Sequence, residues 1–282
     1  MYSRTSMVKI LVFLLIAGIS TSSCIELHQK PIGESKSISL ESKPKYQLSS
    51  IELEIHALIN EERAKNGLKP LKWNSEIAEV AREHSTYLAK ENEPLTDFYI
   101  PCPMPFIHHE GFEFGLYHDE RLKNRRIYYF ASSGENIAII PVSDNKTYEA
   151  EEPYICMQIP QPHSHELSRD TIEKELRKRA EEVKKQPRVT WIRVDWKTQE
   201  EIAKEVVRGW MNSPSHRKNI LFPKYNEEGI GIAEVNDYIV VTQVLIERVK
   251  CGYETGPCCT EPGYYPYCYR PLKCIGGVCK AK

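Results

Sequence analysis

Two short stretches of the chain combine residue types that can bind a cation or transfer protons. Residues 134–138 read Gly-Glu-Asn-Ile-Ala and contain the carboxylate of Glu135. Residues 210–221 read Trp-Met-Asn-Ser-Pro-Ser-His-Arg-Lys-Asn-Ile-Leu and contain the imidazole of His216. A carboxylate and an imidazole can hold zinc or act as acid and base, but they can equally form a buried pair that joins a helix to a sheet. The sequence contains no HExxH, GxSxG or phosphate-loop motif.

Together the two stretches resemble the CAP superfamily (cysteine-rich secretory proteins, antigen 5 and plant pathogenesis-related proteins) in its prokaryotic form. The resemblance covers roughly residues 50–246. It implies a cleft with two histidines and acidic groups, which on this chain are His108, Glu135 and His216. His109 lies one position from His108 in the same motif, so either can be the cleft histidine. Animal members carry a second glutamate where this chain has Ser213, which leaves a reduced but usable zinc set.

The resemblance implies an exported binding protein at the cell surface. Its cleft would take zinc or another divalent cation, a lipid or a small ligand, with His108 and His216 as metal ligands and Glu135 and Ser213 lining the cleft. The alternative is a protease-like hydrolase, zinc-assisted or acid–base, that uses His108, Glu135 and His216. A third hypothesis is a structural envelope protein whose cleft has no ligand. The binding function is favoured, because the family works mostly through binding.

The N-terminus has the layout of an export signal. Positive charge at Arg4 and Lys9 precedes an apolar run over residues 10–19 and small residues before Cys24. Residues 1–24 are therefore predicted to be a signal peptide with a lipobox, in which a lipidated Cys24 anchors the protein to the membrane. Residues 25–48 are rich in Ser, Lys and Pro and are predicted to be a flexible linker. A plain signal peptide with an incidental Cys24 is the alternative.

The remaining cysteines predict disulfides, because export favours oxidation. Cys102 and Cys156 lie in the central domain and are predicted to pair, closing a loop of about fifty residues worth about 3–4 kcal/mol. Residues 249–282 have few aliphatic side chains and are predicted to be a separate module held by three disulfides instead of a core. Its pairing stays open among fifteen possibilities for six cysteines. These six are Cys251, Cys258, Cys259, Cys268, Cys274 and Cys279.

The hydrophobic pattern indicates helices in the first part of the domain and a β-hairpin at its end. Apolar residues at helical spacing follow a predicted serine cap at Ser50, a predicted cap at Asn74 or Ser75, and a capping box at Thr198 and Glu201. Alternating residues over 229–246 flank a two-residue turn. Residues 49–248 are therefore predicted to form an α+β domain, a three-layer α-β-α sandwich as the resemblance implies. An insertion at about 141–197, with a charged helix over 168–186, packs on its surface.

The formal net charge is −1 and basic residues are scattered, so nothing indicates a nucleic-acid partner. A cell-surface protein, a lipid or a carbohydrate is the expected kind of partner. The tyrosines of residues 249–282 suit contact with a sugar or a protein, although small disulfide modules also use tyrosine to cover their bridges. The oligomeric state stays open.

Overall fold

The computed structural model describes residues 8–11, 42–150, 154–156, 167–253, 256–260, 266–269 and 271–281. Cys24 and most of the predicted signal peptide and linker lie outside these residues. Within the described ranges, no helix has the length and apolar character needed to cross a membrane. In chain order the elements are β1 (Val8–Leu11), α1 (Leu48–Lys65), β2 (Lys72–Trp73), α2 (Ser75–Asn92), the 3₁₀ turn η1 (Glu93–Leu95), α3 (His118–Asn124), β3 (Phe130–Pro141), β4 (Ser143–Ala150), α4 (Arg169–Lys184), β5 (Thr190–Trp196), α5 (Gln199–Asn212), α6 (Pro214–Ile220), β6 (Glu227–Val235), β7 (Tyr238–Arg248), β8 (Lys273–Ile275) and β9 (Val278–Lys280).

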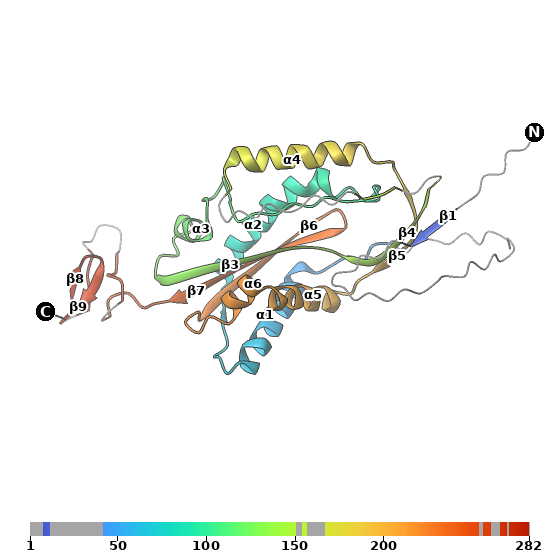
Figure 1. The fold of residues 1–282 in the computed structure, drawn as a ribbon. Coiled ribbons are helices and arrows are strands. Elements are labelled where there is room, and N and C mark those ends of the chain that lie inside the picture. Colours follow the sequence, from blue (N-terminus) through green and yellow to red (C-terminus); the bar gives the residue numbers. More distant parts are fainter. Residues whose placement is uncertain are drawn as a thin grey trace, which may run out of the picture.

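A four-stranded sheet in the order β2-β6-β7-β3 forms the centre of the domain. The predicted hairpin is β6 and β7, which pair antiparallel, and β3 pairs antiparallel with the other side of β7. Helix α2 packs on one face of the sheet, while α1 and α5 pack on the other side (Figure 1). The predicted α-β-α sandwich is confirmed, and β3 is a long strand at one edge of its sheet.

The helix starts follow capping signals at α2 and α5 but not at α1. The Asn74 side chain accepts two backbone N–H groups of the first turn of α2, and Thr198 and Glu201 form the reciprocal capping box of α5. The serine cap predicted for the first helix is wrong, because α1 begins two residues before Ser50. Buried Tyr46 anchors the preceding residues through its hydroxyl, so the helix starts without a side-chain cap.

The largest apolar cluster lies between the sheet and the layer of α1 and α5. Trp210 is fully buried there, and its indole Nε1 donates a hydrogen bond of 3.2 Å to the carbonyl oxygen of Ile137 in β3. Ile51, Ile55 and Ile59 of α1 share the cluster. The tryptophan therefore holds α5 against the edge strand by both packing and a directed bond.

Glycines in β6 allow α2 to lie unusually close to the sheet. A Cβ atom added to Gly229 would overlap backbone atoms of Ala78, and one added to Gly231 would overlap the backbone nitrogen of Arg82. Only glycine leaves room for such contact between two backbones. The spacing of these glycines therefore matches one turn of the helix above them.

Gly231→Ala is expected to lower the free energy of unfolding by about 1–3 kcal/mol, because the added methyl group overpacks the contact between β6 and α2. Chemical denaturation measures the loss. Gly209→Ala in α5 is the matched control, since nothing lies within 4 Å of its added Cβ and alanine favours the helix. Equal stability of Gly231→Ala and the parent chain would contradict this close packing.

The segment predicted as an insertion contains strands that the sequence pattern does not reveal. β4 pairs antiparallel with β5 on one side and with β1 on the other. Tyr148, Trp191 and Val194 form a small apolar cluster of their own there. The predicted charged helix is α4, whose buried Ile172 and Val183 face the loop that follows α2.

Helix α4 and the residues after it are tied to the proline-rich loop over residues 96–107. Buried Arg179 of α4 donates to the carbonyl oxygen of Pro105 at 3.1 Å. The Gln186 side chain bonds both the N–H and the C=O of Cys102, at 2.9 and 2.7 Å, as a neighbouring strand would. Cys102 also forms a disulfide with Cys156. These contacts join the insertion to the domain.

The C-terminal residues form a disulfide-rich module at the end of β7 (Figure 1). Its cysteines pair as Cys251–Cys259, Cys258–Cys274 and Cys268–Cys279, which gives the connectivity that the sequence left open. Strands β8 and β9 pair antiparallel beside them. Tyr129 and Thr260 exchange two hydrogen bonds, of 3.0 and 3.1 Å, between the domain and the module.

Candidate functional site

A cleft of about 730 Å³ lies between the edge strand β3, the helices α5 and α6, and the loop after α2. Its polar lining comes from separated parts of the chain. His108 and His109 lie on the loop, while Ser213, Ser215 and His216 lie at the junction of α5 and α6. Its apolar lining includes residues 137–140 of β3, Leu167 and Trp210. The two predicted histidine stretches therefore meet at one cleft.

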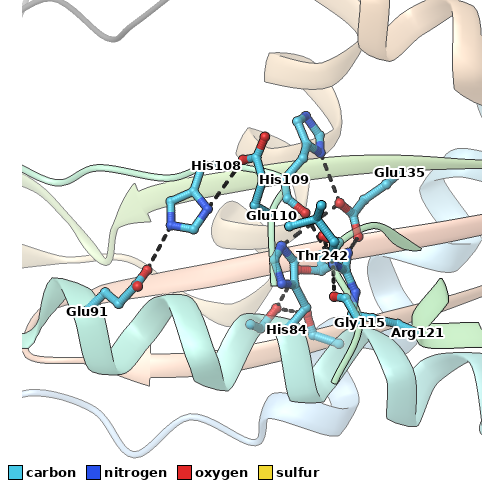
Figure 2. A network of polar contacts seen from close by, with 12 residues as sticks. His84, Glu91, His108, His109, Glu110, Gly115, Arg121, Glu135 and Thr242 are labelled. Atoms are coloured by element: carbon cyan, nitrogen blue, oxygen red, sulfur yellow. Dashed lines mark hydrogen bonds and ion pairs between the residues drawn. The ribbon is translucent and has the colours of Figure 1, made fainter. Parts of the chain in front are cut away.

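Glu135 lies buried beneath this cleft as the centre of a charged network (Figure 2). One of its carboxylate oxygens accepts from Arg121, which is also buried, and the other lies 2.9 Å from Nδ1 of His109. Burial is the largest single influence and raises the pKa of Glu135, but Arg121 together with His84, His109 and His118 holds that pKa well below its usual range. Glu135 is therefore an anion that fixes the ring of His109.

Arg121 also ties the loop to the sheet. Its guanidinium donates to the carbonyl oxygens of His109 and Leu116, both at 3.2 Å, besides its bond to Glu135. Arg121 comes from the first turns of α3, a helix that the sequence analysis did not predict as an element of the site. The Glu-Arg-Leu motif that carries Arg121 is present in the sequence, but its role needs the tertiary fold.

Of the two histidines between which the sequence left the choice open, His109 contacts Glu135 and His108 does not. Nε2 of His108 lies 2.8 Å from Glu91 of α2, and its Nδ1 lies 3.5 Å from Glu110 (Figure 2). Burial alone lowers the pKa of His108, but its contacts with Glu110 and Glu91 raise the pKa above the usual value. The two adjacent histidines therefore face different carboxylates, His109 that of Glu135 and His108 those of Glu91 and Glu110.

Glu110 links this part of the cleft to the insertion. Its carboxylate accepts the backbone N–H of Leu167 at 2.7 Å, just before α4, and burial alone would raise its pKa. The neighbouring His108 and the bond from Leu167 lower that pKa instead. Leu167 itself lines the cleft, so the insertion supplies part of the cleft wall. The sequence analysis missed both residues.

His84 of α2 is buried below Glu135, and neither of its ring nitrogens has a hydrogen-bond partner among the described residues. Nε2 lies 3.9 Å from the nearer oxygen of Glu135. Desolvation lowers the pKa of His84 to about 3, against the attraction of Glu135. His84 is thus a core residue whose ring has no hydrogen bond within the described chain.

Hydrogen bonds from amide side chains, not a contact with Glu135, hold the helix that carries His216. Asn136 of β3 donates to the backbone carbonyl of His216 at 3.3 Å, and Asn219 of α6 donates to the Asn136 side chain at 2.9 Å. Asn219 also donates to the backbone carbonyl of Glu135 at 3.1 Å. The hypothesis that Glu135 and His216 pair directly is therefore wrong, and Asn136 and Asn219 take that structural role.

His216 and Ser213 both face the cleft. Desolvation, and then the nearby His109, lower the pKa of His216, so its imidazole stays neutral at neutral pH. Ser213 stands between α5 and α6, and its hydroxyl lies 3.3 Å from that of Ser215. Among the described residues no imidazole contacts the Ser213 hydroxyl. The cleft therefore combines three imidazoles, two hydroxyls and the carboxylates of Glu110 and Glu205 with an aliphatic strand.

Two residues of the cleft, His109 and His216, are of the kind that could hold a zinc ion or a similar divalent cation, but the described residues of the cleft contain no group of three candidate ligand atoms close to one another. A histidine that binds a metal usually hands its other ring nitrogen to a carboxylate, and His109 has this arrangement with Glu135. His216 can supply a second imidazole, and water completes such sites. A bound cation would act there as a Lewis acid.

The structure is an α-β-α sandwich with a cleft at one edge of its sheet. His109 and His216 line this cleft, close to the buried ion pair of Glu135 and Arg121. The model of the cysteine-rich secretory protein family, CAP, matches residues 56–118 and 163–245. The chain belongs to this family. The interruption between the matched stretches contains β3 with Glu135 and the first part of the insertion. A search of curated proteins found no match.

Solved structures with a similar arrangement come from several bacteria. The chain is 19% identical to an extracellular protein containing an SCP domain from Bacillus anthracis, over 73% of this chain and 45% of that one, with a TM-score of 0.42. It is 16% identical to a cysteine-rich secretory protein from Staphylococcus aureus, over 74% and 42%, with a TM-score of 0.36. It is 15% identical to an outer surface protein from Borrelia burgdorferi, over 74% and 100%, with a TM-score of 0.40. The chain thus spans less than half of the length of the first two proteins.

Proposed function

We propose that this protein is an exported CAP-domain binding protein whose cleft binds a divalent cation such as zinc through His109 and His216. The bond between His109 Nδ1 and the buried carboxylate of Glu135 carries the proposal. It leaves Nε2 of the same ring without a partner among the described residues. An imidazole fixed in this way pays little ordering entropy on binding a metal.

The surroundings of the two imidazoles support this role. Glu135 is held as an anion by Arg121, so it accepts the Nδ1 proton of His109 and favours the tautomer with a free Nε2. The pKa of His216 is lowered by desolvation, so a proton does not compete with a cation at neutral pH. A cation in this cleft would keep open positions for water or a ligand group.

The hydrolase alternative has less support. A serine nucleophile requires a base within hydrogen-bond distance, and the Ser213 hydroxyl contacts Ser215 instead. The anion of Glu135 is paired with Arg121 and His109 and is not available as a general base. Binding is therefore the function that the arrangement of the cleft supports best.

In this proposal the chain acts outside the cell. The signal peptide of residues 1–24, which includes β1, directs export, and its removal leaves β4 paired with β5 alone. A lipidated Cys24 then anchors the chain to the membrane, and residues 25–48 tether the domain. The disulfides of the domain and of the C-terminal module suit an oxidising compartment. The module then contacts a cell-surface protein, lipid or carbohydrate.

His109→Ala and His216→Ala are each expected to weaken zinc binding at least tenfold, because each removes one of two protein ligands. Isothermal titration of the full chain with zinc at neutral pH measures the affinity. His108→Gln is the matched control, since it changes the neighbouring imidazole that contacts Glu91 and Glu110. Unchanged zinc affinity in both alanine variants, or loss in His108→Gln alone, would exclude the proposed ligand pair.

A further inference from the structure

The floor of the cleft is the open edge of a strand. β3 is the terminal strand of the sheet order β2-β6-β7-β3, so only one of its edges is paired by β7. Four consecutive residues, Ile137 to Ile140, line the cleft. Successive side chains of a strand point to opposite faces, so an opening lined by all four runs along the edge of the strand.

Side chains on the two faces of β3 pack into different apolar clusters, as expected if the cleft runs along the edge of the strand. Ile139 packs with the cluster on the α2 side of the sheet. Ala138 and Ile140 pack with the cluster on the α1 and α5 side. The cleft therefore opens between the two helical layers and reaches the backbone of the strand between them.

Side chains already bond the outward carbonyl groups of β3 at every second residue. Asn219 donates to the carbonyl oxygen of Glu135, the Trp210 indole to that of Ile137, and the Lys197 ammonium to that of Pro141. Ile139 occupies the outward position between Ile137 and Pro141. The backbone N–H and C=O of Ile139 point away from β7, and neither has a hydrogen-bond partner among the described residues.

A strand edge with an unpaired N–H and C=O is a template for another extended backbone. We propose that the cleft binds an extended peptide segment as an added strand on β3, bonded to the backbone of Ile139. This inference rests on the proposed binding function of the same cleft and names its ligand class. The ligand is a peptide of at least five residues, because four residues of strand separate Glu135 from Ile139 and each spans about 3.4 Å.

The lining selects the side chains of that peptide. Leu167, Val206 and Trp210 border the strand, so uncharged β-branched or aliphatic residues fit beside Ile139. The end of the peptide nearer Glu135 lies beside His109 and His216, where a carboxylate or carbonyl oxygen can meet the imidazoles or their bound cation. An alkyl chain in the same place would leave the N–H and C=O of Ile139 unpaired and dry, which is unfavourable.

The test uses the full chain and the peptide Ac-Val-Thr-Val-Thr-Val-NH₂ with a fluorescent label, measured by fluorescence anisotropy. Ile139→Pro removes the outward N–H and is expected to weaken binding at least tenfold. Proline is tolerated at outward positions of edge strands, and Pro141 already occupies the next one. Ile139→Val keeps the N–H and is expected to bind like the parent chain.

Two methylated peptides give a readout that does not depend on folding of a variant. One carries N-methyl groups on its second and fourth residues, the other on its first, third and fifth. A peptide added as a strand bonds through one edge, so one isomer is expected to bind like the parent peptide and the other at least tenfold more weakly. Equal binding of both isomers, or no binding of the unmodified peptide, overturns the inference.

Zinc titration separates this inference from the proposed function. Peptide binding that persists in His216→Ala, while zinc binding is lost, supports strand addition independently of the cation. Zinc binding without peptide binding refutes strand addition alone. Displacement of the peptide by myristate, with equal affinity for Ile139→Pro and Ile139→Val, assigns the cleft to an alkyl ligand and also refutes it.

Discussion

Arg121→Met is expected to destabilise the domain by about 3–5 kcal/mol, because it leaves the carboxylate of Glu135 buried without its main cationic partner. Denaturation with guanidinium chloride at neutral pH measures the loss. The variant also frees the loop around His109, whose carbonyl oxygen accepts from the same guanidinium. We therefore expect zinc affinity to fall with stability.

Arg125→Met is the control for this prediction. Arg125 follows the same helix but is half-exposed and pairs with Glu83 at the surface, where an ion pair is worth at most about 1 kcal/mol. The double variant Arg121→Met/Glu135→Leu removes both charges and should recover part of the lost free energy of unfolding. If Arg121→Met were as stable as Arg125→Met, the buried charge of Glu135 would have to be stabilised by a group other than Arg121.

His84→Leu is expected to reduce the fall in the free energy of unfolding that occurs as the pH is lowered. The folded state keeps His84 neutral down to about pH 3, whereas the unfolded chain protonates it near pH 6.5. Between these values the unfolded state binds more protons, so stability falls as the pH falls, by about 4–5 kcal/mol over the whole interval. The leucine variant lacks this contribution. Denaturation midpoints measured from pH 7 to pH 4 for both chains give the difference.

Several neighbours of His84 set the background for that comparison. The lowered pKa values of His118 and His216, each caused first by desolvation, act in the same direction. The pKa of Glu135 is also lowered, so Glu135 is protonated at a higher pH in the unfolded state than in the folded state. This difference lowers the stability of the fold further below about pH 4.5. His216→Leu is the control, with a smaller effect expected because His216 is less buried. Parallel curves for His84→Leu and the parent chain would contradict the assignment to His84.

The parts of the fold that follow local rules could be predicted from the sequence. Asn74, the Thr198–Glu201 capping box and the Asn-Asp turn of the β6–β7 hairpin each act within a few residues, so their pattern is visible in the chain. β4 and β5 were missed, because most of β4 is polar and lacks the alternation of a half-buried strand. Their pairing depends on contacts across the insertion.

The candidate site was predictable only in part. The resemblance correctly brought the stretches around His108 and His216 to one cleft, but a motif cannot decide which of two adjacent histidines faces the sheet. Glu135 decides it, since its charged network reaches His109 and not His108. The amide bonds of Asn136 and Asn219 could not be predicted, because they join a strand to a helix about eighty residues away.

The contact between Glu110 and Leu167 has a consequence for how this cleft can vary. The imidazoles of the cleft and the strand beneath them lie outside the segment that begins with Leu167, while Leu167, just before α4, borders the opening. Exchange of residues 167–186 would alter which ligands enter without touching His109, His216 or Ile139. One wall of the cleft can therefore be varied at Leu167 while the residues proposed to bind the ligand are kept.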